Sequence, residues 1–335
     1  MERYLITNCE DYGREPILRK MRDGTLVCLF LTGGPYEPHN ENVVKIAKSM
    51  DDGATWSEPE VLFSHSSRGC WSTELFTECD KPFAIVQTYN APAHYRELQT
   101  FRSFCNENGS LWNEPISIPG TINGCSVRQG IVLSNGDILF PVYWQEVRHN
   151  FAWDSQAEKS WDTDSWPFIS GVCISSDGGQ SFSRYGHFEF GNATWEPNAI
   201  EVEPGHIILY ARSSKGYLVM TESYDYGRTW CEPTLSNIPN PDTKVTLLKI
   251  KDTILMVNNF NDTIGFKMNA RNNLAIAKSK DGKNFERILD VEAPDELWFY
   301  PHGFIDVEKE ILYLAYENKN QHVLKKFSFE ELGIK

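Results

Sequence analysis

The chain of 335 residues has no long hydrophobic run, no paired cysteine motif and no surplus of positive charge. Without a stretch of about 18 uncharged apolar residues, a membrane-spanning helix is not expected. The eight cysteines are scattered without a Cys-x-x-Cys pair, which argues against a zinc ribbon or redox motif and favours reduced thiols. Acidic residues outnumber basic ones by 46 to 32, and the net charge of −14 disfavours nucleic acid and anionic membranes as partners.

Helical periodicity is also scarce, whereas short runs of β-branched and aromatic residues, typical of strands, are frequent. Examples are residues 25–30 and 206–211. A turn between two such runs recurs at spacings of 47 to 69 residues, which predicts six units of about 57 residues. These turns lie at Asp23-Gly24, Asp80-Lys81, Asn135-Gly136, Pro204-Gly205, Lys251-Asp252 and Lys309-Glu310.

A second motif of eight residues recurs between these turns. Residues 49–56 read SMDDGATW and residues 223–230 read SYDYGRTW. Looser copies lie at residues 175–182 and 279–285, and residues 105–112 keep only Glu107, Gly109 and Trp112. The Asp caps backbone N–H groups, the Gly supplies a positive φ and the aromatic ring packs between strands, so the motif is interpreted as structural.

These repeats predict an all-β fold, a six-bladed β-propeller of four-stranded antiparallel blades that forms a single domain over residues 1–335. Radial closure explains how an all-β chain of this size avoids long exposed edges. The last unit has too few residues for a fourth strand. Residues 3–7 are therefore expected to complete it, which would join both ends of the chain in one blade.

In such blades the starts of first strands and the ends of second strands lie on one face of the ring. Counting nine to ten residues back from the recurrent turns gives Arg14, Trp71, Glu196 and Tyr300 as openings of first strands. Arg212 and Glu317 end second strands, and Arg271 opens the third strand of the fifth unit. Three arginines on one rim of an acidic protein indicate a site for an anion.

This ordered set of residues resembles the sialidase (neuraminidase) superfamily over nearly the whole chain. The matching motifs are the eight-residue boxes, Arg14-Glu15-Pro16, Glu196 before a strand that ends in Ala211-Arg212, Arg271 to Leu274, Tyr300-Pro301 and Tyr316-Glu317. The resemblance implies that Arg14, Arg212 and Arg271 bind the substrate carboxylate and that Glu317 steadies Arg14. It also implies that Tyr300 and Glu196 form the nucleophile pair.

The chemistry of an anionic sugar suits these residue types. Guanidinium groups form bidentate bonds to a carboxylate that lysine cannot form. If the carboxylate sits on the anomeric carbon, an attacking Asp or Glu would bring like charges within about 4 Å, at a cost of about 4 kcal/mol for an effective dielectric near 20. A neutral tyrosine that passes its proton to a neighbouring carboxylate avoids that repulsion.

The first unit departs from the sialidase pattern. Sialidases place a catalytic aspartate in the loop after the second strand, but residues 33–42 contain no Asp. His39 lies in the middle of this loop and is the first candidate for the general acid. Glu37 or Glu41 would serve if burial raised its pKa.

A long segment between Trp144 and Trp166 accounts for the largest spacing between turns. It carries Trp144, His149, Trp153, Trp161 and Trp166, which suit stacking against sugar rings or an oligomer contact equally well. Tyr89-Asn90 and His94-Tyr95-Arg96 in the second unit lie on the same face, and their contribution stays open.

The sequence therefore predicts a sialidase-like exo-glycosidase that releases a terminal anionic sugar, with sialic acid the first candidate, from small glycans. We expect no metal or organic cofactor, no nucleic acid or membrane partner, and a cytoplasmic location. One alternative is a uronate-specific hydrolase or polysaccharide lyase that uses His39 and Tyr300. A second alternative is a non-catalytic glycan-binding propeller, against which Tyr300, Glu196 and Glu317 argue, because binding alone needs only the arginines.

Overall fold

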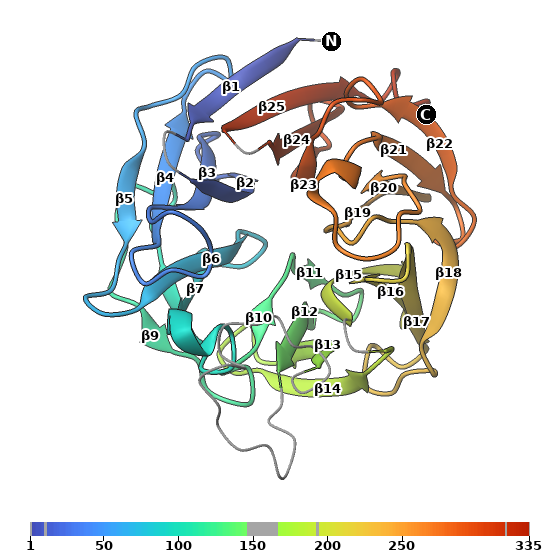
Figure 1. Ribbon diagram of the computed structural model, residues 1–335, viewed down its shortest axis with the longest axis horizontal. Coiled ribbons are helices and arrows are strands. Elements are labelled where there is room, and N and C mark those ends of the chain that lie inside the picture. Colours follow the sequence, from blue (N-terminus) through green and yellow to red (C-terminus); the bar gives the residue numbers. More distant parts are fainter. Residues whose placement is uncertain (1, 10–11, 146–166, 192–193, 319, 335) are drawn as a thin grey trace.

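The computed structural model describes residues 2–9, 12–145, 167–191, 194–318 and 320–334. These residues form six antiparallel sheets around a central axis, with almost no helix (Figure 1). The sheets follow one another around the ring in chain order, as the colours from blue to red show. The predicted all-β fold, a six-bladed propeller, is confirmed.

Each blade runs from an inner strand at the axis to an outer strand at the rim. The third blade has a split inner strand, whose two short pieces, β10 and β11, both pair with β12. The first blade consists of β2 (Gly13–Lys20), β3 (Leu26–Thr32), β4 (Val43–Ser49) and β5 (Glu60–Phe63), and the second of β6 (Gly69–Phe76), β7 (Phe83–Tyr89), β8 (Gln99–Phe104) and β9 (Ile116–Ser117). The third consists of β10 (Ser126–Val127), β11 (Ile131–Val132), β12 (Ile138–Gln145), β13 (Phe168–Ser175) and β14 (Ser183–Phe188), and the fourth of β15 (Thr194–Glu203), β16 (His206–Ser213), β17 (Tyr217–Ser223) and β18 (Thr234–Pro239). The fifth consists of β19 (Thr246–Ile250), β20 (Thr253–Asn259), β21 (Leu274–Ser279) and β22 (Glu286–Asp290), and the sixth of β23 (Phe299–Asp306), β24 (Ile311–Glu317), β25 (Gln321–Ser328) and β1 (Arg3–Asn8).

The last blade is closed by the N-terminal strand, as the sequence predicts. Strand β1 pairs antiparallel with β25, with Leu5 opposite Val323 and Asn8 opposite Gln321. The two ends of the described chain consequently lie on the same side of the ring (Figure 1). Two short 3-10 turns lie in the described part of the chain, η1 (Ala91–Ala93) and η3 (Met268–Ala270). Within the described residues, no helix has the length and hydrophobicity needed to cross a membrane.

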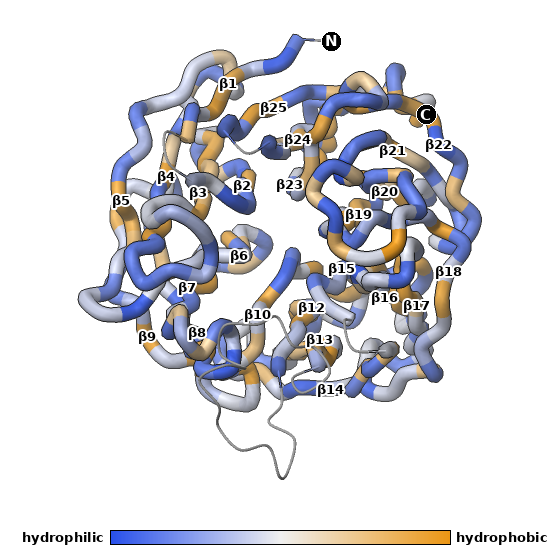
Figure 2. The backbone as a smooth tube through the Cα atoms, in the orientation of Figure 1, coloured by the Kyte–Doolittle hydropathy of each residue, from blue (hydrophilic) through white to orange (hydrophobic). Residues whose placement is uncertain are grey.

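Hydrophobic packing between neighbouring blades holds the ring together. Six clusters of buried residues each join two successive blades, and Figure 2 shows hydrophobic residues concentrated along the strands. Leu29 of the first blade, for example, shares a cluster with Val86 of the second, and Leu18 shares one with Tyr313 of the sixth. A seventh cluster gathers aromatic rings such as Trp71, Tyr95 and Tyr143 near one mouth of the central channel.

The eight-residue motif forms the capped turn that its sequence predicts. Asp225 accepts hydrogen bonds from the backbone N–H of Thr229 at 2.8 Å and from its hydroxyl at 2.7 Å, and Gly227 has a φ of +82°. The Trp230 indole donates to the carbonyl of Gly227 at 2.8 Å. In the loosest copy the cap is Asn106, which accepts from the N–H of Ser110 at 2.9 Å, rather than the predicted Glu107.

We expect Trp230→Ala to lower the free energy of unfolding by about 3 kcal/mol, because the ring packs on the cluster between the third and fourth blades. Thermal or urea unfolding measures this loss, and Met50→Ala, at a side chain 91% exposed in the first box, is the control. Ligand binding per folded molecule should survive. A variant that melts like the parent but loses ligand binding would place the boxes on the functional face.

Candidate functional site

A cavity of about 430 Å³ opens at one mouth of the central channel, where first strands begin and second strands end. The recurrent turns lie at the other mouth, around Lys20, Glu201 and Asp306. Glu317 lies directly behind the cavity, 3.2 Å from Arg14. His39 is not among the lining residues. The other predicted site residues all line the cavity: Arg14, Glu196, Arg212, Arg271 and Tyr300.

An irregular backbone at the start of the inner strands directs these side chains. Glu15, Glu196 and Tyr300 have φ values of +52°, +46° and +55°, and the register of their strands shifts at the same points. Asp242, just before β19, has a φ of +56°. A positive φ is strained for any of these residue types, and such strain clusters at functional sites. Four blades therefore share one local device that presents a polar side chain to the channel.

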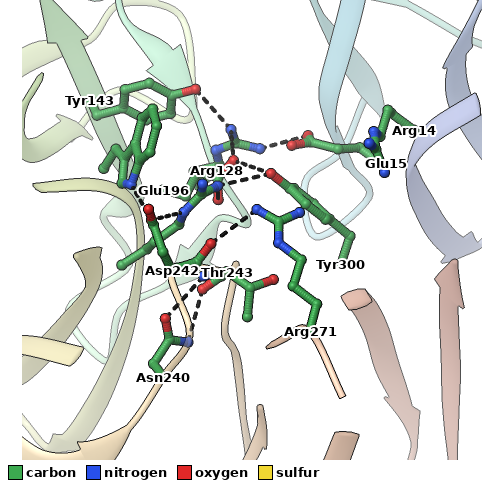
Figure 3. Close-up of polar contacts among 12 residues, drawn as sticks. Arg14, Glu15, Arg128, Tyr143, Glu196, Asn240, Asp242, Thr243, Arg271 and Tyr300 are labelled. Atoms are coloured by element: carbon green, nitrogen blue, oxygen red, sulfur yellow. Dashed lines mark hydrogen bonds and ion pairs between the residues drawn. The ribbon is translucent and has the colours of Figure 1, made fainter. Parts of the chain in front are cut away.

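Tyr300 and Glu196 form the hydrogen-bonded pair that the sequence predicts. The Tyr300 hydroxyl donates to Glu196 Oε1 at 2.8 Å (Figure 3). Arg212 Nη1 lies 2.7 Å from Glu196 Oε2 and 2.9 Å from the Tyr300 oxygen. Burial and the neighbouring Glu196 raise the pKa of Tyr300 well above 10. Burial alone would raise the pKa of Glu196, but Arg212 and Arg128 outweigh it and hold that pKa below its usual value. The proton thus rests on the phenol, beside an ionised carboxylate.

Arg128 is a further arginine of the site that the sequence analysis does not identify. Its side chain is 1% exposed and lies 2.6 Å from Glu15 Oε2 and 3.4 Å from Glu196 Oε1. Arg128 Nη2 also donates to the Tyr143 hydroxyl at 3.0 Å. A buried carboxylate needs such partners to stay ionised. Arg128 therefore fixes Glu196 from the side opposite Arg212.

Arg14 is anchored from behind by a buried charged group. Glu317 Oε1 pairs with Arg14 Nη1, while Glu317 Oε2 lies 3.1 Å from His322 Nε2. Burial would lower the pKa of His322, but Cys9 and Glu317 raise it to about 9, so the imidazole is charged at neutral pH. The Tyr12 hydroxyl accepts a further bond from Arg14 Nε at 2.9 Å. The remaining Arg14 nitrogen, Nη2, has no hydrogen-bond partner among the described residues.

Arg271 differs from the other arginines of the cavity because no carboxylate in the described part of the chain pairs with it. Its side chain is 2% exposed, and its one hydrogen bond runs from Nη2 to the backbone carbonyl of Asp242 at 3.0 Å. Burial lowers the pKa of Arg271, as do Arg212 and Arg14. Arg271 does not open β21 directly, as predicted, but ends the η3 turn three residues earlier. A buried guanidinium without a counter-ion calls for an anion.

The loop of the first blade brings Glu37, not His39, to the cavity. The Tyr95 hydroxyl donates to Glu37 Oε1 at 2.7 Å. Burial and the charge of Glu15 raise the pKa of Glu37 to about 7. His39 instead turns back on its own loop, where Nδ1 accepts the backbone N–H of Glu41 at 3.2 Å. Its ring also packs edge-on against Tyr36.

Aromatic side chains form much of the remaining wall, contributed by Trp71, Tyr95, Tyr143, Trp195 and Phe266. Phe266 is 56% exposed and covers the Arg271 guanidinium at 4.9 Å. The segment between Trp144 and Trp166 lies almost wholly outside the described residues, so stacking by His149, Trp153, Trp161 and Trp166 stays a prediction. Across the residues that the structure does describe, no group of three or more His, Cys, Asp or Glu side chains is arranged to hold a metal ion.

Asp242 and Arg128, which the sequence analysis does not select, each have a recognisable position relative to the recurrent turns. Asp242 lies nine residues before Lys251, so the counting rule, applied to the fifth unit, selects it. Arg128 lies seven residues before Asn135 because the inner strand of the third blade is split. A Pro follows the strained residue in three blades, at Glu15-Pro16, Glu196-Pro197 and Tyr300-Pro301.

Comparisons with known proteins agree with this architecture. A family model described as a BNR repeat-like domain matches residues 24–316. A sialidase of Bacteroides fragilis is 25% identical over 325 residues, which cover 84% of this chain. The chain spans 55% of the length of that relative.

Solved structures show the same fold. A Hadza microbial sialidase superposes with a TM-score of 0.72 at 17% identity, over 95% of this chain and 66% of the other. Trypanosoma rangeli sialidase in complex with the inhibitor DANA gives the same score and identity over 99% and 60%. A Dyadobacter fermentans protein of unknown function gives 0.72 at 14% identity over 97% of both chains. Because the family model matches most of this chain, the chain belongs to the BNR repeat-like domain family and is a propeller of the sialidase superfamily.

Proposed function

We propose that the protein is a retaining exo-glycosidase that releases a terminal sugar bearing a carboxylate, with sialic acid as the first candidate. One observation carries the proposal: a tyrosine hydrogen-bonded to an ionised glutamate lies beside Arg271, a buried arginine with which no carboxylate of the described residues pairs. The pair supplies a nucleophile and its base, and the arginine supplies a place for the carboxylate. Related sialidases support the substrate class, since Trypanosoma rangeli sialidase has been solved with 2,3-difluorosialic acid as a covalent intermediate.

In the first step, the Tyr300 oxygen bonds to the anomeric carbon while its proton passes to Glu196 Oε1, 2.8 Å away. The bond from the anomeric carbon to the leaving oxygen breaks, and that oxygen takes a proton from a general acid. In the second step the same acid, now a carboxylate, removes a proton from water as the water attacks the anomeric carbon. The bond to Tyr300 breaks and Glu196 returns the proton to the phenol. Two inversions give net retention.

Arg212 suits this step because it contacts both members of the nucleophile pair. Its positive charge stabilises the phenolate that develops on Tyr300 as the proton leaves. Free tyrosine has a pKa near 10, and burial raises that of Tyr300 further, so attack at neutral pH depends on Glu196 and on this cation.

Glu37 is our choice for the general acid in place of His39. It lines the cavity, and its raised pKa of about 7 keeps a proton available near neutral pH. Tyr12 and Tyr95 hold its two oxygens, with Tyr12 at 3.5 Å and Tyr95 at 2.7 Å. In this proposal the Glu37 carboxyl group takes the role of the catalytic aspartate that sialidases have in this loop, where residues 33–42 contain no Asp.

We expect Tyr300→Phe to lower kcat by at least three orders of magnitude, because it removes the only covalent handle while preserving the shape of the cavity. Glu196→Gln should also be impaired. Fluorogenic sialosides and uronides measure turnover, and Tyr217→Phe, on β17 away from the cavity, is the matched control. Release from sialosides alone fits the proposal.

Three results of that panel contradict the proposal. Turnover of uronides alone would favour a uronate hydrolase. An unsaturated product absorbing in the near ultraviolet would indicate a lyase. A wild-type protein that binds the acids but turns over neither class would be a glycan-binding module.

Glu37 should set the basic limb of the pH profile. Because the carboxyl must carry its proton to donate it, kcat/KM should fall tenfold per pH unit above pH 7 and be constant from there down to the acid limb that Glu196 sets. Glu37→Gln should abolish this limb and cost 10²- to 10⁴-fold on alkyl glycosides. Nitrophenyl glycosides, whose leaving group needs little protonation, should lose far less. An unchanged profile in Glu37→Gln, with the loss found in His39→Gln instead, would return the role to His39.

Arg271→Lys should weaken the binding of the free sugar acid by about 2–3 kcal/mol, because lysine keeps the charge but loses the bidentate fork. Isothermal titration calorimetry measures the loss, with Arg22→Lys on the outer surface as the control. Unaltered affinity for both sialic and glucuronic acid in Arg271→Lys and Arg271→Met would show that no carboxylate binds there.

A further inference from the structure

Asp242 is a buried carboxylate that enters the cavity among the arginines. Its Oδ1 lies 2.5 Å from Arg212 Nε and accepts the Trp195 indole N–H at 3.0 Å. Its backbone carbonyl accepts Arg271 Nη2 at 3.0 Å. A single residue, 2% exposed, therefore contacts two of the three arginines to which the sialidase resemblance gives the same task. Figure 3 shows its contact with Arg271.

The backbone around Asp242 is built to hold it in place. Asn240 donates to the carbonyl of Thr243 at 2.9 Å and accepts the Thr243 N–H at 3.0 Å, which closes a turn over Asp242. Asn240 also donates to Asn258 Oδ1 at 2.8 Å. These bonds maintain the strained φ of +56° at Asp242. Figure 3 shows the Asn240 side chain bonded to this turn below Asp242.

Counting donors separates Arg212 from Arg271. A guanidinium has five N–H donors, and Arg212 commits three of them: Nε to Asp242 and both protons of Nη1 to Glu196 and Tyr300. Neither edge of Arg212 can therefore form a bidentate pair with a ligand. Arg271 commits one donor, and its Nε is buried without a partner among the described residues.

We propose that Asp242 dedicates Arg212 to the Tyr300–Glu196 pair, so that the substrate carboxylate is held by Arg271 and Arg14 and not by a triad. Asp242 is then a positioning residue for the nucleophile. It supplies the counter-charge that a buried Arg212 needs and fixes the guanidinium plane so that Nη1 reaches both partners. The inference rests on the proposed function for its kinetic readout, but its structural readout is independent of turnover.

The test compares Asp242→Ala and Asp242→Asn with Arg271→Met. Asp242→Ala should lower kcat at least 30-fold while the dissociation constant of the free sugar acid changes less than threefold. Asp242→Asn should lose less, because its amide oxygen still accepts Arg212 Nε. Arg271→Met should weaken acid binding more than 30-fold. Asp306→Asn, which removes a partly buried ion pair with Lys20 at the other mouth of the channel, is the matched control.

The pH profile adds a readout that a purely structural role would not move. Glu196 must be ionised to accept the Tyr300 proton, so its pKa sets the acid limb of kcat/KM. Releasing Arg212 removes a positive charge beside Glu196, and the acid limb should move to higher pH. The charged and titratable groups that act on Glu196 from the surrounding elements are Glu15, Glu37, Arg128, Tyr143, Arg212, Lys244, Arg271 and Tyr300.

Crystal structures of the parent and of Asp242→Ala give the independent test. In the parent soaked with a sugar acid, we expect the carboxylate on Arg271 and Arg14, with the Arg212–Asp242 pair intact. In Asp242→Ala, Arg212 should leave Tyr300. The proposal is wrong if Arg212 keeps its place without Asp242, or if Asp242→Ala weakens acid binding as much as Arg271→Met does. Failure of the proposed function is a separate result, seen as no turnover and no acid binding by the parent.

Discussion

Burying positive charge is the constraint on which this site depends. Arg128, Arg212 and Arg271 each lie at 3% exposure or less, and a guanidinium removed from water is tolerated only with partners. Glu15, Glu196 and Asp242 meet that need for Arg128 and Arg212, whereas no carboxylate in the described part of the chain pairs with Arg271. The same network keeps Glu196 ionised next to a neutral phenol. The proposed positioning of the nucleophile and the proposed binding of an anion therefore have one physical origin.

The propeller supplies the geometry that makes this network possible. Inner strands from six blades begin around one channel, so residues 303 positions apart meet within hydrogen-bond distance, as Arg14 and Glu317 do. The packing between blades and the Asp-capped turns lie away from that mouth and fix the ring. At the starts of three inner strands a positive φ directs Glu15, Glu196 and Tyr300 inward. Stability and chemistry thus occupy different ends of each strand.

The fold was predictable because each blade is marked by repeated sequence motifs. The capped turn at Asp225 and the closing strand at residues 3–7 both follow from local sequence. The placement of Tyr300 and Glu196 followed from counting along equivalent strands. The choice between Glu37 and His39 did not, because it depends on the path of one loop and on the bond from Tyr95, which belongs to another blade. The counting rule selects Asp242 as a residue of the site, but it does not give the ion pair with Arg212, which joins two blades.

The central claim is that Tyr300 becomes covalently attached to the substrate. A 2,3-difluorosialic acid donor forms its glycosyl adduct but hydrolyses it slowly, so the intermediate accumulates. After incubation with the parent protein and proteolysis, peptide mass spectrometry should find the sugar on the peptide that contains Tyr300, with one adduct per active molecule. An adduct on Glu196, Glu37 or His39, or hydrolysis of ordinary sialosides without any adduct, would contradict the account.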